Sequence, residues 1–398
     1  MDDKNVIGLV SGTSADGVDA AIVNIKGFGL NSKVKLVDFQ TFPYPAKIKK
    51  EILKASSPDS SRVDQICSLN FLLGKVFAGA ALKIIKKSKM KKRDIALIGS
   101  HGQTIYHMPH QSSKKNAKTP STLQIGEPSI IAEMTGITTV SDFRPRDIAA
   151  GGMGAPLTPY VHYLLFRNKK ETRAVHNIGG ISNVTVIPDN NDIDKVIAFD
   201  TGPGNMAIDG IISKLTRNHK KYDEMGEWAS KGKVDKRLFD ILMNHPYITK
   251  PPPKSTGREE FGNHFIDRIL KIAEKYNISD NDLISTVTAF TSDSIILNYK
   301  LFVLPRFNLS RIIFGGGGTK NLTLLSWLKK GLAPLSIHTM EDYHYSSDAL
   351  EAMAFGILAN ETISGIPNNL PLVTGAKKKT ILGKIVPGKL KNSFLFQR

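Results

Sequence analysis

The sequence predicts an α/β protein built from two units of similar construction. Each half opens with short apolar runs separated by turns of glycine, aspartate or asparagine, a pattern typical of antiparallel strands. Strands are expected at 6–10, 20–25 and 34–42 in the first half, and at 174–178, 184–187 and 196–199 in the second. The matching openings suggest a duplicated fold, although the two halves share no plain sequence repeat.

Helices and shorter strands follow each opening. Helices are expected at 46–55, 62–88, 128–135, 203–216, 235–244, 262–275, 280–304, 321–331 and 349–364. Further strands are expected at 95–100, 138–141, 312–314 and 335–338. The second helix is the clearest, because Leu69, Leu73, Val76, Phe77 and Ala80 recur at helical spacing.

Length and composition indicate a folded protein of more than one domain. A chain of 398 residues exceeds what one core usually supports, and its 41% hydrophobic and 23% charged residues are ordinary for a soluble protein. We expect an N-terminal lobe of residues 1–142 plus 365–398 and a C-terminal lobe of residues 143–364.

The cysteine content and the apolar stretches of the sequence indicate the cellular compartment of the protein. The single cysteine, Cys67, excludes an internal disulfide and a cysteine metal cluster, and we expect it in the core. The N-terminus lacks a basic and apolar leader, and no apolar stretch is expected to span a membrane. These features favour a cytoplasmic protein.

The net charge of +18 comes from lysine clusters at 47–54, 83–93 and 377–384 and a lysine-rich loop at 109–120. Few aromatic residues are interleaved with these lysines, so the pattern does not favour nucleic-acid binding. A positive surface instead helps to gather anionic ligands such as nucleotides or acidic sugars.

The turn after the first strand carries the strongest chemical signal. Its residues are Gly12, Thr13, Ser14, Ala15, Asp16, Gly17, Val18 and Asp19. Glycines let backbone N–H groups close on an anion, hydroxyls donate to phosphate oxygens, and Asp16 could hold Mg²⁺ directly or through water. We interpret the segment as a nucleotide phosphate cradle without a Walker lysine; the alternative is an ordinary hairpin turn.

Two further glycine segments occur in the second half. Asn177, Gly179 and Gly180 form a second turn of glycine and small polar residues after a strand, which could hold the other side of a phosphate chain. A Gly-Gly hairpin is, however, common by itself. Gly315, Gly316 and Gly317 lie in a run of four glycines that could admit adenine or its phosphates, or could be a flexible loop.

Asp200 ends an apolar strand immediately before the turn Gly202-Pro203-Gly204. A carboxylate placed there suits a general base, whereas the alternative is a turn or helix-capping aspartate.

Two polar segments of the first half complete the candidates. His101 and Gln103 follow a buried strand, where polar residues line crevices in such folds. Arg144 and Arg146 stand between Asp142 and Asp147 and could hold an acidic ligand, or form a salt-bridged crossover between lobes.

Taken in order, these segments resemble the actin/sugar-kinase/Hsp70 superfamily, whose lobes have a ribonuclease H-like fold, and more narrowly the anhydro-N-acetylmuramic acid kinase family. The resembling motifs are Ser11–Asp19, Ser100–Thr104, Asp142–Arg144, Gly154–Leu157, Asn177–Gly180, Phe199–Asn205, Ser255–Glu259 and Glu351–Phe355. The likeness runs from Gly8 to about Gly388, nearly the whole chain.

The resemblance implies a two-lobed duplicated fold with an interdomain cleft and an ATP- and Mg²⁺-dependent enzyme of cell-wall sugar recycling. Water opens the 1,6-anhydro ring at C1 while O6 receives the γ-phosphoryl group, giving N-acetylmuramic acid 6-phosphate. The first turn then holds the ATP phosphates, and Asp200 activates the water. The sugar contacts are His101, Gln103, Arg144, Arg146 and Glu351. The protein is expected to be a homodimer.

Two alternatives remain open. One is a kinase of levoglucosan or another 1,6-anhydrosugar; Met153 and the long basic loop at 109–120 depart from the muramic acid branch, whereas Gly154 and Leu157–Pro159 favour it. The other is a nucleotide-operated binding protein like Hsp70, which is expected to carry a peptide-binding module after the ATPase.

Overall fold

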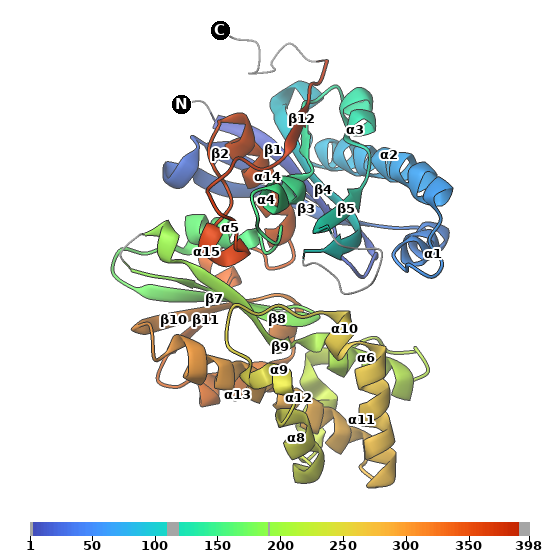
Figure 1. Cartoon of the computed structure of the whole chain (residues 1–398), viewed down its shortest axis with the longest axis vertical. Helices are drawn as coiled ribbons and strands as arrows, with labels where there is room; N and C mark the ends of the chain where they lie inside the picture. Colours follow the sequence, from blue (N-terminus) through green and yellow to red (C-terminus); the bar gives the residue numbers. More distant parts are fainter. Residues whose placement is uncertain (1–2, 110–118, 190–191, 390–398) are drawn as a thin grey trace. The chain divides into compact units, whose positions relative to one another are not determined.

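A computed structural model describes residues 3–109, 119–189 and 192–389. The chain forms two compact units (Figure 1). Unit 1 comprises Met1–Leu165 and Ala349–Arg398, and unit 2 comprises Phe166–Asp348. Most of the expected lysine-rich loop, residues 110–118, lies outside the described residues.

Unit 1 is built on a mixed sheet that has seven strands in the described part of the chain. They are β1 (Asp3–Ser11), β2 (Gly17–Lys26), β3 (Lys33–Pro43), β4 (Ile95–Met108), β5 (Ser121–Ile125), β6 (Thr139–Ser141) and β12 (Lys384–Val386). Their order is β12-β6-β4-β1-β2-β3, and β5 pairs with β4. The β1–β2 and β2–β3 pairs are antiparallel, whereas β1–β4 and β4–β6 are parallel.

Helices pack around this sheet. They are α1 (Ala46–Ala55), α2 (Val63–Lys87), α3 (Pro128–Thr135), α4 (Phe143–Ala149), α5 (Thr158–Phe166), α14 (Leu350–Ile363) and α15 (Pro371–Thr374). Ile7 and Leu9 of β1 share one hydrophobic core with Leu73 and Phe77 of α2. The central strand β1 is therefore held by apolar packing along its length.

Helix α14 lies directly on β1, β2 and β4 (Figure 1). A Cβ atom on Gly8 would lie 1.7 Å from the Ala352 carbonyl oxygen, and one on Gly99 would lie 2.0 Å from the Phe355 carbonyl oxygen. Only glycine permits this approach of strand and helix backbones.

This packing corrects the expected domain boundaries, because residues 143–165 and 349–364 belong to unit 1. The physical reason for the second segment is the contact of α14 with the unit 1 sheet. For the first, the buried Asp147 carboxylate accepts hydrogen bonds from Asn369 Nδ2 and Thr374 Oγ1, both at 2.8 Å.

Helix α2 corrects two further expectations. By length and composition it is apolar enough to cross a membrane, but half of the qualifying stretch is buried inside the protein. Leu73, Phe77 and Ile84 pack into the unit 1 core, which accounts for the apolar composition. Cys67 was expected in the core; it is exposed, because it lies on a different face of α2 from these residues.

Unit 2 has a sheet of five strands within the described residues. They are β7 (Thr172–Ile178), β8 (Ile181–Ile187), β9 (Ile197–Pro203), β10 (Leu309–Gly315) and β11 (Ser336–Thr339), in the order β11-β10-β7-β8-β9. The β7–β8 and β8–β9 pairs are antiparallel, and the β7–β10 and β10–β11 pairs are parallel. Each unit thus contains the same arrangement of three antiparallel strands followed by two parallel ones, and the predicted duplication is confirmed.

The helices of unit 2 are α6 (Asn205–Leu215), α7 (Glu227–Lys231), α8 (Lys236–Met243), α9 (Pro246–Thr249), α10 (Arg258–Phe261), α11 (Asn263–Lys275), α12 (Asp280–Asn298) and α13 (Leu322–Gly331). The helix expected at 280–304 ends at Asn298 and continues as a π-helical turn, Tyr299–Val303. Tyr299 and Val303 of this turn belong to the same core as Phe314 and Leu328.

The strand expected at 95–100 is longer than predicted. β4 continues to Met108, so the segment Ser100–Thr104 lies inside the strand and not at its end. The continuation is stabilised by β5, which pairs with β4 from Gln103 to Met108. Sequence patterns missed β5, β12, α4, α5, α7, α9, α10 and α15 because these elements are short and depend on tertiary partners.

Candidate active site

The turn between β1 and β2 presents its small residues to solvent. Gly12, Thr13 and Ser14 are exposed, whereas Ala15 is fully buried. The turn is closed by the Ala15 N–H, which donates to the Gly12 carbonyl at 3.1 Å, and Ala15 has a φ of 51°. Alanine rarely adopts this left-handed conformation, so the turn holds a strained backbone, as ligand-binding loops often do.

Gln103 fixes this turn from the neighbouring strand β4. Its Oε1 accepts from the Ser11 hydroxyl at 2.6 Å, and its Nε2 donates to the Gly12 carbonyl at 3.2 Å. Gln103 is 1% exposed. The Gln103 side chain therefore packs against the turn and is not on a free surface, which differs from the sugar contact expected for it. Its amide instead supports the candidate phosphate cradle.

The two glycines of the turn differ in what surrounds them. A Cβ on Gly12 would meet only the Ser14 Oγ, at 3.9 Å, so the space beside Gly12 is open. A Cβ on Gly17 would lie 2.4 Å from the Phe42 carbonyl oxygen of β3. Gly12 thus leaves room for a ligand, whereas Gly17 is required by the pairing of β2 with β3.

The carboxylates of the turn both have protein partners. Asp16 is exposed and forms an ion pair with Lys49 of α1. Asp19 accepts a hydrogen bond of 2.5 Å from the Thr41 hydroxyl. Within the described residues, no cluster of three or more histidine, cysteine or acidic side chains could hold a metal ion. A cation here would need ligands from a bound phosphate chain, which is how Mg²⁺ is usually held by kinases.

His101 and Arg144 form a buried pair in unit 1. Arg144 Nε donates to His101 Nε2 at 2.9 Å, and Arg144 Nη1 donates to the Gly154 carbonyl at 2.7 Å. Since guanidinium is only a donor, His101 Nε2 must be unprotonated, and its Nδ1 donates to the Gly102 carbonyl. Burial and the Arg144 charge hold the pKa of His101 well below its usual range, so this histidine is neutral.

Glu351 begins α14 near the same pair. Its side chain is solvent-accessible, yet desolvation by the surrounding protein and the negative charge of Asp19 raise its pKa, while Arg144 acts in the opposite direction. Burial lowers the pKa of Arg144 to about 10, with Glu351 and Asp147 opposing the shift. Asp19 of the turn, Glu351 and Arg144 are therefore within electrostatic reach of one another.

The environment of Arg146 differs from that of the His101–Arg144 pair. It is exposed on α4, whereas the neighbouring Asp147 is fully buried and structural. Gly154 N–H also donates to Asp147, at 2.8 Å. Asp147 of the arginine-rich segment has a structural role, because its buried carboxylate accepts hydrogen bonds from the chain around it. Arg144 of the same segment belongs to the polar group around His101.

A polar pocket of about 220 Å³ borders the His101 strand in unit 1. Its lining includes His101, Gln124, Glu127 and Asp142, and Lys384, which donates to Asp142 at 2.8 Å. Hydroxyl, amide and carboxylate groups of this kind are suited to a polyhydroxylated ligand.

In unit 2, the turn between β7 and β8 meets the start of α6. The N–H groups of Gly204, Asn205 and Met206 donate to the carbonyls of Gly180, Gly179 and Gly180 at 2.9, 2.7 and 3.1 Å. The first N–H groups of a helix usually lack partners, and here the turn supplies them.

The glycine run after β10 reaches the same place. Gly316 has a φ of 83°, and a Cβ there would lie 2.5 Å from the Asn177 Oδ1. A Cβ on Gly318 would lie 2.3 Å from the Ile178 Cγ2, and one on Gly317 would lie 3.5 Å from the Asn205 Nδ2. Residues 317–320 form a short 3-10 helix, and Asn321 caps α13 by accepting from the Leu324 N–H at 2.9 Å. The structure therefore brings together three segments of unit 2 that sequence analysis singled out separately.

Asp200 lies in β9, next to this group of glycines in the chain. Its Oδ2 accepts from the Thr256 N–H at 2.9 Å. Burial raises the pKa of Asp200 to about 6, and the Glu259 charge adds to the increase, while hydrogen bonds from Thr256 and Ser255 and the Lys254 charge oppose it. A half-buried carboxylate with an oriented oxygen and a pKa near neutrality has the properties of a general base.

Lys254 and Tyr247 also contact Asp200 and were missed by sequence analysis. The Lys254 carbonyl accepts from the Asp200 N–H at 3.2 Å, and the Tyr247 hydroxyl donates to the Asp200 carbonyl at 3.1 Å. The motif Ser255–Glu259 was noticed only for its resemblance to a family. Nothing in the local pattern of Lys254 could have revealed that its side chain is buried.

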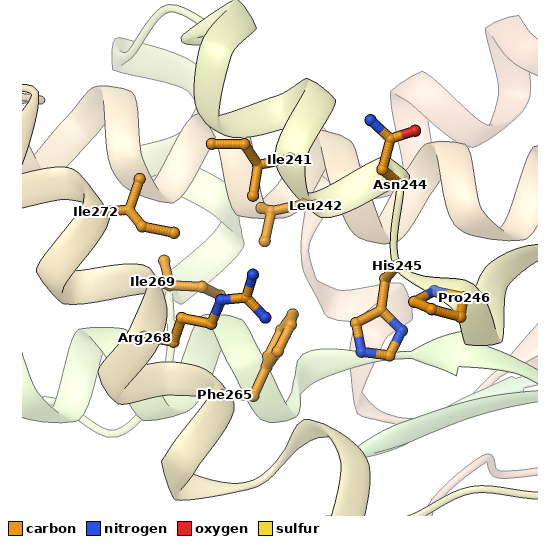
Figure 2. Close-up of a pocket in the computed structure, with 9 residues that line it drawn as sticks. All are labelled: Ile241, Leu242, Asn244, His245, Pro246, Phe265, Arg268, Ile269 and Ile272. Carbon is orange, nitrogen blue, oxygen red and sulfur yellow. The ribbon is translucent and has the colours of Figure 1, made fainter.

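A second pocket, of about 360 Å³, lies in unit 2 and contains none of the predicted site residues. Figure 2 shows the Arg268 guanidinium between Leu242 and Phe265, with His245 beside them. The lining is mainly apolar and has no carboxylate, so it does not match the chemistry expected for a sugar or for phosphate transfer.

The repeated sheet topology is that of the actin/sugar-kinase/Hsp70 superfamily, and a kinase of this class could use the exposed glycine turn of unit 1 and the Asp200 carboxylate of unit 2. Comparison with known proteins narrows the class. Residues 4–388 match the sequence model of the family described as anhydro-N-acetylmuramic acid kinase. The chain belongs to this family.

Close relatives cover almost the full length. An anhydro-N-acetylmuramic acid kinase of Caldanaerobacter subterraneus subsp. tengcongensis is 50% identical over 384 residues, which is 96% of this chain and 97% of the relative. One from Bacillus thuringiensis subsp. konkukian is 48% identical over 382 residues, covering 96% and 98%. Among solved structures, the activator of 2-hydroxyisocaproyl-CoA dehydratase from Clostridium difficile, with bound ADPNP, matches with a TM-score of 0.43 and 12% identity, covering 92% of this chain and 99% of that one.

Proposed function

We propose that this protein is the ATP-dependent kinase that converts 1,6-anhydro-N-acetylmuramic acid into N-acetylmuramic acid 6-phosphate, a step of cell-wall sugar recycling. Water attacks C1 of the sugar and loses a proton to the base. The C1–O6 bond breaks, O6 attacks the γ-phosphorus of ATP, and ADP leaves. The family membership supports the substrate and the reaction.

The observation that carries the proposal is the state of Asp200. As the base for water, it must be ionised at working pH and still basic enough to accept a proton. A pKa raised to about 6 by burial meets both requirements, and the hydrogen bond from Thr256 fixes one carboxylate oxygen. The alternative of a helix-capping aspartate is not favoured, since the Asp200 side chain does not cap α6.

The remaining predicted residues take roles that their surroundings favour. The turn Gly12–Asp19 holds the ATP phosphates through its exposed residues Gly12, Thr13 and Ser14, and the space beside Gly12 is open. Asn177, Gly179 and Gly180, with Gly315, Gly316 and Gly317, contribute to the nucleotide site. Arg144, His101 and Glu351 contact the sugar, and the charge of Arg144 suits the lactyl carboxylate. Arg146 is exposed and free to approach an acidic ligand.

Mg²⁺ fits the exposed Asp16 carboxylate, directly or through water, together with phosphate oxygens of the nucleotide. The ion would neutralise the phosphate charge during phosphoryl transfer. Lys49 already pairs with Asp16, so its ammonium must be displaced or shared when the ion binds.

The decisive experiment compares two anhydrosugars. The purified protein is incubated with Mg-ATP and either 1,6-anhydro-N-acetylmuramic acid or levoglucosan, which has the anhydro ring without the N-acetyl and lactyl groups. We expect the first to gain one water and one phosphoryl group by mass, and the second to react far less. Equal turnover of both sugars, or ATP hydrolysis without sugar phosphorylation, would contradict the proposal. Substrate labelled with ¹⁸O at O6 should keep the label in the phosphate ester.

We also propose that the protein works in the cytoplasm as a homodimer. The reaction consumes ATP, which is a cytoplasmic substrate, and α2 exposes Val63 and Phe71 beside Cys67 on its outer face. Sedimentation velocity measures the oligomeric state directly. A monomer at micromolar concentration would remove the dimer from the proposal without affecting the reaction.

A further inference from the structure

Lys254 is a buried lysine beside the proposed base. Its residue is only 5% exposed, although lysine is almost always at the surface. The Nζ donates to the carbonyls of Tyr247 and Ile248 at 3.2 and 3.1 Å. Within the described residues, no acidic side chain forms an ion pair with it, so backbone oxygens hold the ammonium.

Aromatic rings complete the surroundings of the ammonium. The Nζ lies 4.9 Å from the ring centroid of Tyr247 and 5.1 Å from that of Phe302. Phe302 belongs to the π-helical turn Tyr299–Val303 that follows α12. Such turns are rare and often occur at functional sites, and cations are attracted to the faces of aromatic rings.

Residues 247–256, whose ends are joined by the Lys254 side chain, form several hydrogen bonds with Asp200. The Asp200 N–H donates to the Lys254 carbonyl, the Tyr247 hydroxyl donates to the Asp200 carbonyl, and the Thr256 N–H donates to the carboxylate. The Lys254 side chain, by folding back onto Tyr247 and Ile248, ties the two ends of this segment together.

Asn298 joins the same segment to β9 from the other side. Its Nδ2 lies 3.0 Å from the Thr201 carbonyl, 3.2 Å from the Ile248 carbonyl and 2.8 Å from the Ser294 carbonyl. Asn298 and Thr201 are both fully buried. The Ile248 carbonyl is therefore shared by Lys254 and Asn298, and Thr201 is the next residue after Asp200.

We propose that Lys254, Asn298 and Tyr247 form a clamp that positions Asp200 for proton transfer. The inference rests on the proposed function of Asp200 as the base. A buried ammonium is costly, and a methionine would fill much the same volume without that cost. The polar arrangement is explained by what it holds: the Lys254 carbonyl and the Tyr247 hydroxyl bond the Asp200 backbone, and Asn298 bonds the carbonyl of the next residue, Thr201. None of the three residues is assigned a contact with sugar or nucleotide, so each is a positioning residue.

The clamp also places a positive charge near the base. The charged and titratable groups that face Asp200 are Lys254 in its segment, Glu259 of α10 and Tyr247 of α9. The Lys254 ammonium favours the ionised carboxylate, whereas Glu259 opposes it. Loss of the ammonium should therefore move the acidic limb of the kcat–pH profile to higher pH.

The test compares Lys254→Met with Lys271→Met, which removes an exposed lysine of α11 in the same unit. A displacement of reacting groups by about 1 Å can cost up to ~100-fold in rate. We expect kcat of Lys254→Met to fall about 10- to 100-fold, with the KM values for ATP and sugar within about twofold. The acidic limb of the kcat–pH profile should move to higher pH by about half a unit. The control should retain the wild-type kcat and profile.

A milder variant keeps the test decisive if Lys254→Met does not fold. Tyr247→Phe removes only the hydroxyl that donates to Asp200 and leaves the ring beside the ammonium. We expect a kcat decrease of about 3- to 10-fold with unchanged KM values, because one hydrogen bond is worth about 1 kcal/mol. Wild-type kcat in both folded variants, or in Tyr247→Phe alone when Lys254→Met is unfolded, would overturn the clamp.

Asp200→Asn separates this inference from the proposed function. If Asp200→Asn is inactive while the clamp variants are fully active, Asp200 remains the base and only the clamp is wrong. If Asp200→Asn retains wild-type kcat, the role of Asp200 itself fails, whatever the clamp variants show.

Discussion

The two hairpins that open the two sheets occupy the same place in the topology and yet differ in what they leave available. In unit 1, the turn between β1 and β2 exposes Gly12, Thr13 and Ser14, and its closing bonds come from Gln103 and from within the turn. In unit 2, the carbonyls of Gly179 and Gly180 are already used by the N–H groups that begin α6.

The difference teaches how one duplicated sheet can serve two tasks. The unit 1 turn exposes Gly12, Thr13 and Ser14 to solvent, and the backbone N–H groups of an exposed glycine-containing turn suit a phosphate site. The unit 2 turn is joined to the start of α6 and so fixes the chain that follows β9, the strand that carries Asp200. The predictions below test this division, from the largest expected effect to the smallest.

Asp200→Asn should remove turnover and leave nucleotide binding intact. A general base contributes about 10²–10⁴-fold to rate, and asparagine cannot accept the proton. We expect kcat to fall by about that factor while the dissociation constant of ATP, measured by calorimetry, stays within about twofold. A nearly normal kcat in this mutant would mean that another residue acts as the base. The proposed difference in role between the two hairpins would then be wrong.

Gly12 and Gly17 should separate ligand binding from folding. A Cβ at Gly17 would strike the Phe42 carbonyl, so Gly17→Val is expected to lower the free energy of unfolding by about 1–3 kcal/mol or more. At Gly12 the space is open, so Gly12→Val should change stability by less than about 0.5 kcal/mol. It should nevertheless weaken ATP binding about tenfold, because the valine occupies the room left for phosphate.

Denaturant unfolding and calorimetric ATP titration on both variants check this pair. Gly12→Val with normal ATP affinity would mean that the unit 1 turn does not contact the nucleotide. An equal loss of stability in both variants would show that both glycines serve the turn alone.

The pH dependence should follow Asp200. The base acts only when it is deprotonated, so kcat should decline as pH falls through about 6, where its pKa lies. Below that value the decline approaches tenfold per pH unit, as for any single essential base. An ordinary aspartate would titrate near pH 4. A profile that is flat down to pH 5 would contradict the assignment, provided that circular dichroism shows the protein folded there.

Asp16→Asn should have the smallest effect on folding. The Asp16–Lys49 ion pair is exposed, and exposed pairs contribute about 0–1 kcal/mol to stability. We expect no measurable change in the unfolding midpoint. If Asp16 helps to hold Mg²⁺, the concentration of Mg²⁺ that gives half-maximal activity should increase. An unchanged Mg²⁺ requirement would leave Asp16 as a surface residue of the turn.

Much of the fold could be predicted because its signals are local. The apolar runs of β1 and β2 and the helical spacing of α2 each depend on residues close in the chain. The same local patterns indicated the glycine turns and placed Asp200 on a strand, although β9 continues beyond the predicted strand end, to Pro203. The duplicated order of strands was then confirmed by the two sheets.

What the sequence could not determine depends on partners far away along the chain. Gln103 looks like a crevice residue until β4 is placed beside β1, where its amide meets Ser11 and Gly12. Gly17 resembles a ligand-binding glycine until Phe42 is brought against it. α14 resembles the end of the second unit until its backbone contacts Gly8 and Gly99.

The surroundings of Asp200 show the same limit most clearly. The sequence by itself predicted a carboxylate at the end of an apolar strand, whereas the structure places Asp200 inside β9, which continues to Pro203. Only the tertiary structure decided that Lys254 and Asn298 lie buried beside it and that its pKa is raised. Side-chain charge and hydrogen-bonding capacity are written in the sequence. Burial and the choice of partners arise only when distant segments pack and exclude water.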